Sequence, residues 1–211
     1  MYGKNELRSV ISGVGDHAAT NLICAAAHHL REGQEASRIA QKPGLSKEEE
    51  TEKLIEWINI NNLWISNHDE TRFIASGAEQ RVYLHEDGFS VYKLNDSIFY
   101  QYWVDYFHSL LIHNYFFPAT AYLLIGFYHA EETLYAVVKQ PFIEITELTD
   151  VESVKAFLAQ NGFQLKKNND YFSSELGLIL EDLHEENVLS NNGILFFIDT
   201  VFYLENSFYK D

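Results

Sequence analysis

The 211-residue sequence has a single cysteine, Cys24, so no internal disulfide can form. So few cysteines are typical of a reducing cytoplasm, and the apolar helical pattern around Cys24 favours a buried small side chain. Long apolar runs are also lacking, and no basic-then-apolar stretch resembles a signal peptide. We therefore expect a cytoplasmic protein that does not bind a membrane.

Basic residues are scarce as well. Lysine and arginine number 15 against 31 aspartates and glutamates, which gives a formal net charge of −16. The longest basic run is the pair at 166–167, so we expect no nucleic-acid partner, because such binding depends on neutralising phosphates. Hydrophobic residues make up 46% of the chain and aromatic residues 15%, which is the content of a folded protein with one sizeable or two small domains.

Three polar residues, Asp182, Asn187 and Asp199, lie between apolar runs in the segment 178–200. An apolar strand leads to Asp182, and the turn residues at 191–193 predict a hairpin that returns Asp199 toward Asn187. One amide and one carboxylate oxygen suit Mg²⁺, and Asp182 could then face a substrate hydroxyl. The alternative is a surface hairpin in which these residues only form turns.

This order resembles the catalytic loop of the protein kinase-like superfamily, with an Asp, an Asn five residues later and a metal-binding Asp after the next hairpin. The Asp-Leu-His-x-x-Asn form at 182–187 is similar to small-molecule (aminoglycoside-type) kinases and to the compact polyvalent protein kinase domains of bacterial and mobile-element proteins. The resemblance implies an α+β, protein kinase-like fold with a five-stranded antiparallel N-lobe sheet plus one helix, a strongly reduced C-lobe and an N-terminal helical extension. It also implies ATP and Mg²⁺ as cofactors.

From residue 71 the hydrophobic period becomes that of strands, and we expect three antiparallel strands before residue 95. The resemblance places Gly77 and Ala78 in a turn over the nucleotide phosphates and assigns Lys93 to bind them. The alternative for Lys93 is a solvated lysine on an edge strand, although side-chain alternation puts it on the face of Val91 and Phe89.

An aromatic helix is expected over residues 97–115, and its aromatic face is more typical of a core than of a ligand site. In the resembled family this helix offers a glutamate to the lysine, whereas here the only acid is Asp105, whose side chain is shorter. Strands at 121–127 and 134–138 would complete the sheet.

The resemblance places the hinge between the lobes at residues 140–143. There, backbone groups of Gln140 and Phe142 would hydrogen-bond the adenine edge. Two departures from the family pattern follow later in the chain: Leu180-Glu181 precedes Asp182 where the family usually has His-Arg or His-Gly, and Thr200 stands where it has a glycine.

Residues 1–66 are expected to be helical, with one helix capped by Asp16 and ended by Gly33. The spacing of Ser46 and Glu49 predicts a capping box at the start of another helix. These helices could be a lid, an added layer or the contact of a homodimer, and we expect them to determine what the protein acts on.

The sequence thus predicts three segments: an N-terminal helical region (1–66), an N-lobe-like region (67–145) and a truncated C-lobe-like region (146–211). The first functional hypothesis is a Mg²⁺-dependent ATP phosphotransferase acting on a hydroxyl of an unknown protein or small molecule. Its predicted residues are, by role, Asp182 and Lys93 for catalysis, Asn187 and Asp199 for the metal, and Gly77, Ala78, Lys93, Gln140, Phe142, Asn187 and Asp199 for the nucleotide. The alternatives are a pseudokinase or nucleotide-binding module without catalysis, and an interaction protein with no nucleotide site.

Overall fold

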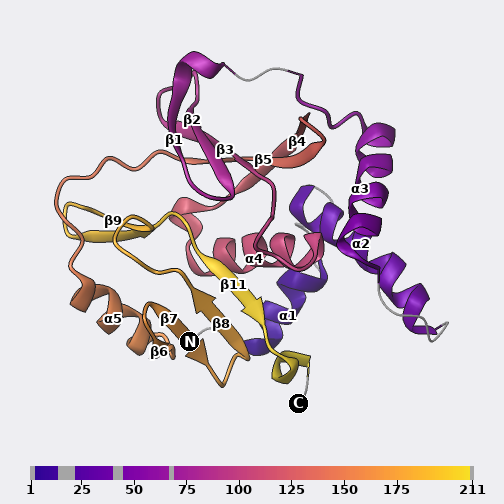
Figure 1. Ribbon diagram of the computed structural model, residues 1–211. Coiled ribbons are helices and arrows are strands. Elements are labelled where there is room, and N and C mark those ends of the chain that lie inside the picture. Colours follow the sequence, from indigo (N-terminus) through magenta and orange to yellow (C-terminus); the bar gives the residue numbers. More distant parts are fainter. Residues whose placement is uncertain (1–2, 14–21, 40–44, 67–68, 210–211) are drawn as a thin grey trace. The chain divides into compact units, whose positions relative to one another are not determined.

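The computed structural model describes residues 3–13, 22–39, 45–66 and 69–209 (Figure 1). The expected cap at Asp16 lies outside these ranges. Contacts divide the chain into two compact units, which we describe in turn. The first unit comprises Met1–Ile11, His108–Ala121 and Ile143–Asp211, and the second comprises Ser12–Phe107 and Tyr122–Phe142.

The second unit contains the expected five-stranded antiparallel sheet, with strand order β1-β2-β3-β5-β4 (Figure 1). A 3-10 turn, η1 (Glu70–Arg72), leads into it. The strands are β1 (Phe73–Ser76), β2 (Gln80–Leu84), β3 (Ser90–Asn95), β4 (Leu123–Ala130) and β5 (Thr133–Pro141). Asp87 closes the turn between β2 and β3, since its Oδ1 accepts from the backbone N–H groups of Phe89 and Ser90 at 2.8 and 2.9 Å.

The edge strand β4 is covered by a short segment that the sequence did not predict. The Ile65 N–H donates to the Phe127 carbonyl at 2.8 Å, and the Phe127 N–H donates to the Leu63 carbonyl at 2.9 Å. At Gly126, which is next to this contact, a Cβ atom would lie 2.6 Å from the Leu63 oxygen. A glycine is therefore required here, because the covering segment brings two backbones together.

Two helices, α2 (Leu22–Ile39) and α3 (Lys47–Asn61), contact each other, and α2 contacts β4. Ser46 and Glu49 form both bonds of the predicted capping box at the start of α3. The prediction that Gly33 ends the preceding helix is wrong, because α2 continues to Ile39; a glycine inside a helix costs only about 1 kcal/mol.

The apolar faces of these two helices are used inside the protein. Their fully buried side chains include Ile23, Leu30, Leu54 and Ile58. A homodimer through the N-terminal helices, which stays a prediction, would therefore need other residues.

Helix α4 (Trp103–Phe116) crosses the boundary between the units and begins later than the expected residue 97. Asn95 Oδ1 accepts from the Ser97 N–H at 2.7 Å, and Asp96 Oδ1 accepts from the Ile98 N–H at 3.0 Å. Ser97 also has a left-handed φ of 55°. These side-chain bonds hold the chain in turns, which compete with helix formation.

The first unit contains two small antiparallel sheets, ordered β11-β8-β7-β6 and β10-β9. Their strands are β6 (Gln164–Lys167), β7 (Asp170–Ser173), β8 (Leu178–Glu181), β9 (Val188–Asn191), β10 (Ile194–Phe197) and β11 (Val201–Leu204). The hairpin of β9 and β10 is as predicted, with Asn192 and Gly193 at φ values of 49° and 75° in its turn. Strand β11 was not predicted.

The first unit also contains helical segments. They are α1 (Lys4–Ser12), α5 (Val151–Gln160), the second part of α4, and the 3-10 turns η2 (Pro118–Thr120) and η3 (Asn206–Tyr209). Asp150 caps α5 as predicted, since it accepts from the N–H groups of Glu152 and Ser153. No helix in the described part of the chain is long and apolar enough to cross a membrane.

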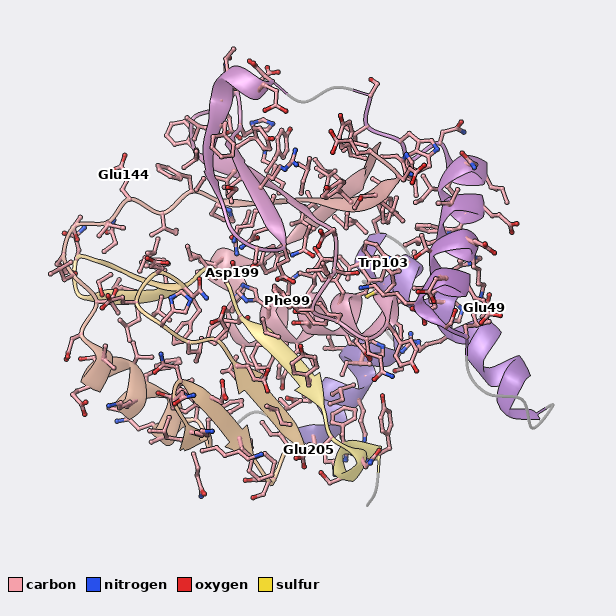
Figure 2. The ribbon with its side chains drawn as sticks, viewed as in Figure 1. Glu49, Phe99, Trp103, Glu144, Asp199 and Glu205 are labelled. Atoms are coloured by element: carbon pink, nitrogen blue, oxygen red, sulfur yellow. The ribbon has the colours of Figure 1, made fainter. Side chains whose placement is uncertain are left out.

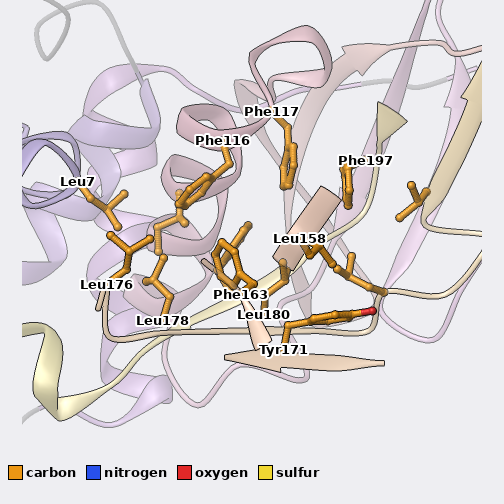
Figure 3. Close-up of a cluster of buried hydrophobic side chains, with 14 of the residues drawn as sticks. Leu7, Phe116, Phe117, Leu158, Phe163, Tyr171, Leu176, Leu178, Leu180 and Phe197 are labelled. Atoms are coloured by element: carbon orange, nitrogen blue, oxygen red, sulfur yellow. The ribbon is translucent and has the colours of Figure 1, made fainter. Parts of the chain in front are cut away.

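The first unit has one aromatic-rich core (Figure 3). Phe117 and Phe197 stack with their ring centroids 4.2 Å apart, and Leu7 of α1 is fully buried in the same cluster. Lys4 and Arg8 of α1 also donate to the carbonyls of Ser207 and Phe208, each at 2.7 Å. Helix α1 is therefore part of this core.

Candidate active site

The loop between β8 and β9 carries Asp182 and Asn187. Asp182 has a φ of 63°, a left-handed conformation that Asp and Asn adopt more readily than other non-glycine residues. Two backbone bonds close the loop: the His184 N–H donates to the Asp182 carbonyl at 3.1 Å, and the Asn187 N–H donates to the His184 carbonyl at 3.0 Å. These bonds hold Asp182 in a fixed position directly after β8.

Asp182 orients the side-chain amide of Asn187. Asn187 Nδ2 donates to the main-chain oxygen of Asp182 at 2.8 Å and to its carboxylate Oδ2 at 3.1 Å. Because both acceptors are oxygens, the nitrogen arm of the amide must face Asp182. The amide oxygen, Oδ1, then faces away from the two Asp182 oxygens and could bind a cation.

His184 completes this cluster. Its Nε2 lies 3.3 Å from Asp182 Oδ1 and 3.1 Å from Asn187 Nδ2. One carboxylate oxygen of Asp182 thus contacts Asn187 and the other contacts His184, while the Asp182 side chain remains 59% exposed. Asp182 is therefore both oriented by neighbours and accessible to a substrate.

The hairpin returns Asp199 to Asn187, as the sequence predicts. The carbonyl of Asn187 accepts from the N–H groups of Ile198 at 3.0 Å and Asp199 at 3.4 Å; Asp199 is labelled in Figure 2. An amide oxygen and a carboxylate are hard ligands that fit Mg²⁺, which takes few protein ligands and completes its shell with water and phosphate oxygens. Asn187 and Asp199 could therefore hold Mg²⁺.

Thr200, which stands where the resembled family has a glycine, anchors the chain directly after Asp199. Its Oγ1 lies 2.7 Å from Nδ1 of the buried His113 in α4. His113 contacts Thr120 with its other ring nitrogen. The residue that follows Asp199 is thus hydrogen-bonded to the second part of α4.

Lys93 lies in the second unit. Its strand, β3, is inside the sheet, where Lys93 pairs with Val82 on one side and Val138 on the other. The side chain is only 4% exposed, so the alternative of a solvated edge-strand lysine is wrong. Lys93 Nζ lies 5.4 Å from the ring centroid of Tyr122, a distance at which the ring face attracts a cation. Phe89, expected on the same strand face, lies before β3 and is exposed.

Because Lys93 belongs to the second unit, its convergence with Asp182, Asn187 and Asp199 stays a prediction. The same holds for the nucleotide contacts expected of the phosphate loop and the hinge.

Asp105, the only acid of α4, acts at the start of its own helix. Burial raises the pKa of Asp105, while a hydrogen bond with the backbone of Tyr102 opposes this rise. The buried Glu50 of α3 serves the same helix end, since its Oε2 accepts from the Val104 N–H at 3.3 Å. Both carboxylates therefore satisfy the first turn of α4, where acidic groups also suit the helix dipole.

The expected phosphate loop, residues 76–80, is closed by a bond from the Gly77 N–H to the Gln80 carbonyl at 2.9 Å. Gly77 and Ala78 are both exposed. A Cβ atom added at Gly77 would meet only Gln80 Cγ, at 3.9 Å, and the backbone there is not left-handed. The protein itself therefore places no steric demand for a glycine at residue 77.

The expected hinge begins at the end of β5. Gln140 pairs with Val91 and is almost completely buried. The Phe142 N–H donates to the Phe89 carbonyl at 2.8 Å, so this amide is already used within the sheet. Pro141 has no N–H, and an adenine contact at Phe142 would therefore use its carbonyl.

Sequence reasoning assigned no role to His184, His113 or Tyr122. His184 could have been found, because it lies inside the Asp-Leu-His motif only two residues after Asp182. His113 gave a weaker signal, since a histidine in an apolar helix needs a polar partner when buried. Tyr122 gave none, because its contact with Lys93 depends on how β3 and β4 are arranged.

One comparison with known proteins agrees with the family resemblance of the sequence. A family model described as serine/threonine/tyrosine kinase found in polyvalent proteins matches residues 47–206. This match covers well over half of the chain and extends from the first residue of α3 to η3. No curated protein and no solved structure matches the chain significantly. The chain therefore belongs to the Kinase-PolyVal family, the serine/threonine/tyrosine kinases found in polyvalent proteins.

Proposed function

We propose that the protein is a Mg²⁺-dependent phosphotransferase that moves the γ-phosphoryl group of ATP to a hydroxyl group. One observation carries the proposal: Asp182, Asn187 and Asp199 are joined by hydrogen bonds, with Asn187 bonded to each of the other two. Family membership favours a serine, threonine or tyrosine side chain as the acceptor, and the Asp-Leu-His form of the loop leaves a small-molecule alcohol as the alternative.

In this proposal, the second unit binds the nucleotide. Lys93 contacts phosphate oxygens, and the exposed turn of Gly77 and Ala78 covers the phosphates. Gln140 and Phe142 border the adenine. Asn187 Oδ1 and the Asp199 carboxylate of the first unit hold Mg²⁺, which, when bound, neutralises charge on the phosphates.

The transfer itself makes and breaks one bond at phosphorus. The acceptor oxygen bonds to the γ-phosphorus while the bond between that phosphorus and the β–γ bridging oxygen breaks, giving a phosphate ester and ADP. Asp182 orients the acceptor hydroxyl and receives its proton on the carboxylate. Asn187 and His184 each contact one oxygen of that carboxylate, so its direction is set before the acceptor arrives.

A nucleotide-binding module without transfer is the second candidate, and one observation favours it. In active protein kinases an ion pair between the lysine and a helix glutamate must be in place. Here α4 contains no glutamate, and its only acid, Asp105, has a shorter side chain that bonds the backbone of Tyr102. The two candidates agree on nucleotide binding and differ only in turnover.

Turnover is tested by following radiolabelled γ-phosphate from ATP, with Mg²⁺, into pools of serine, threonine and tyrosine peptides and of small alcohols. We expect transfer by the wild type, and a loss of about 10²- to 10⁴-fold in Asp182→Asn, the usual contribution of a proton acceptor. Glu185→Gln, which removes an exposed charge from the same loop, should stay active.

Three results would contradict the proposed function or the role of Asp182 in it. Transfer by Asp182→Asn at the wild-type rate would make Asp182 structural. Binding of ATP without transfer to any acceptor would favour the second candidate. Absence of ATP binding would leave an interaction protein with no nucleotide site.

A further inference from the structure

A chain of buried hydrogen bonds runs through the residues that follow Asp199. Thr200 Oγ1 lies 2.7 Å from His113 Nδ1, and His113 Nε2 lies 3.0 Å from the Thr120 carbonyl. A carbonyl only accepts, so Nε2 carries the ring proton. In the neutral ring Nδ1 is then an acceptor, and the Thr200 hydroxyl donates to it. For the neutral ring, the direction of both bonds is thereby fixed.

The same network holds the backbone on both sides of Asp199. Before it, Thr120 Oγ1 donates to the Phe197 carbonyl at 2.5 Å. After it, Ser109 Oγ accepts from the Phe202 N–H at 2.9 Å and donates to the Thr200 carbonyl at 3.5 Å. The four side chains of the network, which we call the Thr200 anchor, are all buried: Ser109, His113, Thr120 and Thr200.

We infer that Thr200 and His113 are positioning residues that fix Asp199 beside Asn187. Breaking a buried hydrogen bond costs free energy, and rotation of the chain at Thr200 would break its bond with His113 Nδ1. Asp199 is therefore held in one place before any ligand binds. In this account the Thr200 anchor preforms the metal site. The inference rests on the proposed function, because it takes Asp199 as a metal ligand.

Threonine is the residue that makes this anchor possible. The glycine that the resembled family has at this point has no side chain and a permissive backbone, so it could neither bond His113 nor restrict rotation. Valine has nearly the shape of threonine without the hydroxyl, and serine keeps the hydroxyl without the methyl group. These two substitutions separate the hydrogen bond from packing.

The test compares Thr200→Val with Thr200→Ser in the full chain, using two readouts. The first is amide hydrogen exchange at Ile198 and Asp199, whose N–H groups bond the Asn187 carbonyl. The second is the Mg²⁺ concentration that gives half-maximal ATP-dependent thermal stabilisation. We expect Thr200→Val to exchange faster at both amides and to need about 10- to 100-fold more Mg²⁺, the usual effect of losing a partner behind a metal ligand. Thr200→Ser should resemble the wild type in both.

Ser109→Ala provides a second variant in case Thr200→Val does not fold, since alanine is the best helix former and the change removes the bonds to Phe202 and Thr200. It should change both readouts in the same direction. Wild-type exchange and wild-type Mg²⁺ dependence in Thr200→Val, or in Ser109→Ala, would overturn the inference. If the wild type shows no Mg²⁺-dependent ATP binding, the proposed function fails, and amide exchange alone decides whether the anchor positions Asp199.

Discussion

Asn187 bonds Asp182 with its side chain and Asp199 with its backbone. The amide Nδ2 donates to the Asp182 carbonyl at 2.8 Å, while the Asn187 carbonyl accepts from the Asp199 N–H at 3.4 Å. The residue proposed to orient the acceptor and the residue proposed to hold the metal are thus linked through one asparagine. A change at Asn187 should therefore affect both.

Asn187→Ala should lose Mg²⁺-dependent ATP stabilisation and lower the free energy of unfolding by about 1 kcal/mol, the net contribution of an ordinary hydrogen bond. Urea denaturation measures the second effect. Glu186→Ala, which changes an exposed side chain in the same loop, is the control and should alter neither quantity. Unchanged Mg²⁺ dependence in Asn187→Ala would show that this amide is not a ligand.

Tyr122 should matter for ATP affinity through its ring face. Tyr122→Phe keeps a ring beside the Lys93 ammonium, whereas Tyr122→Leu keeps an apolar side chain and removes the ring. A desolvated cation–π contact contributes about 2 kcal/mol, so we expect Tyr122→Leu to weaken ATP binding by about 10- to 30-fold, as measured by calorimetry. Tyr122→Phe should bind nearly as the wild type does. Equal affinities in all three proteins would argue against this role of the ring.

Two glycines should respond oppositely to alanine. Gly77 has an ordinary backbone conformation and room for a Cβ, so Gly77→Ala should keep the wild-type melting temperature and weaken ATP binding by crowding the phosphates. Gly88 has a φ of 70°, so Gly88→Ala should cost about 1 kcal/mol of stability and leave ATP affinity unchanged. If Gly77→Ala binds ATP like the wild type, the loop at 76–80 does not approach the phosphates closely.

Asp87 should give stability a pH dependence. The hydrogen bond from Lys139 is the main cause that holds the pKa of this carboxyl well below its usual range, and the Phe89 N–H, Ser90 and His85 add to it. A depressed pKa in the folded state contributes stability that is present above the unfolded pKa, about 3.9, and is lost as the pH falls toward the folded pKa. The wild type should thus exceed Asp87→Asn in stability by a constant amount above about pH 5, and the difference should shrink below pH 4.

Urea denaturation at a series of pH values measures this difference. Lys139→Met should remove the larger part of the same dependence, because its ammonium is the main partner of Asp87. A difference between wild type and Asp87→Asn that stays constant down to pH 2 would contradict the assignment.

The predictable parts of the site are those that depend on neighbours in sequence. The turn at Asn192-Gly193 and the apolar strands on either side were enough to bring Asp199 back to Asn187. The expected start of α4 at residue 97 is wrong because the side chains of Asn95 and Asp96 hold the residues before Trp103 in turns, which aromatic periodicity does not indicate.

The remaining parts depend on tertiary contacts. His113 and Thr200 are 87 residues apart, and nothing local to either residue indicates the other. Glu50 is one of three acids in the first turn of α3, yet it is buried and bonds the first turn of α4. Packing between secondary-structure elements determines such partners, and neither composition nor hydrophobic periodicity indicates them.

The most direct test of the account is the melting temperature of the full chain with ATP and Mg²⁺, with ATP alone, and in the variant Asp199→Asn. A ligand at a hundred times its dissociation constant adds about 2.7 kcal/mol, which for a chain of this size raises the melting temperature by about 5–10 °C. The account predicts that rise for the wild type with ATP and Mg²⁺ together, a much smaller one without Mg²⁺, and none for Asp199→Asn. An equal rise in the wild type and Asp199→Asn, or no rise in either, would contradict it.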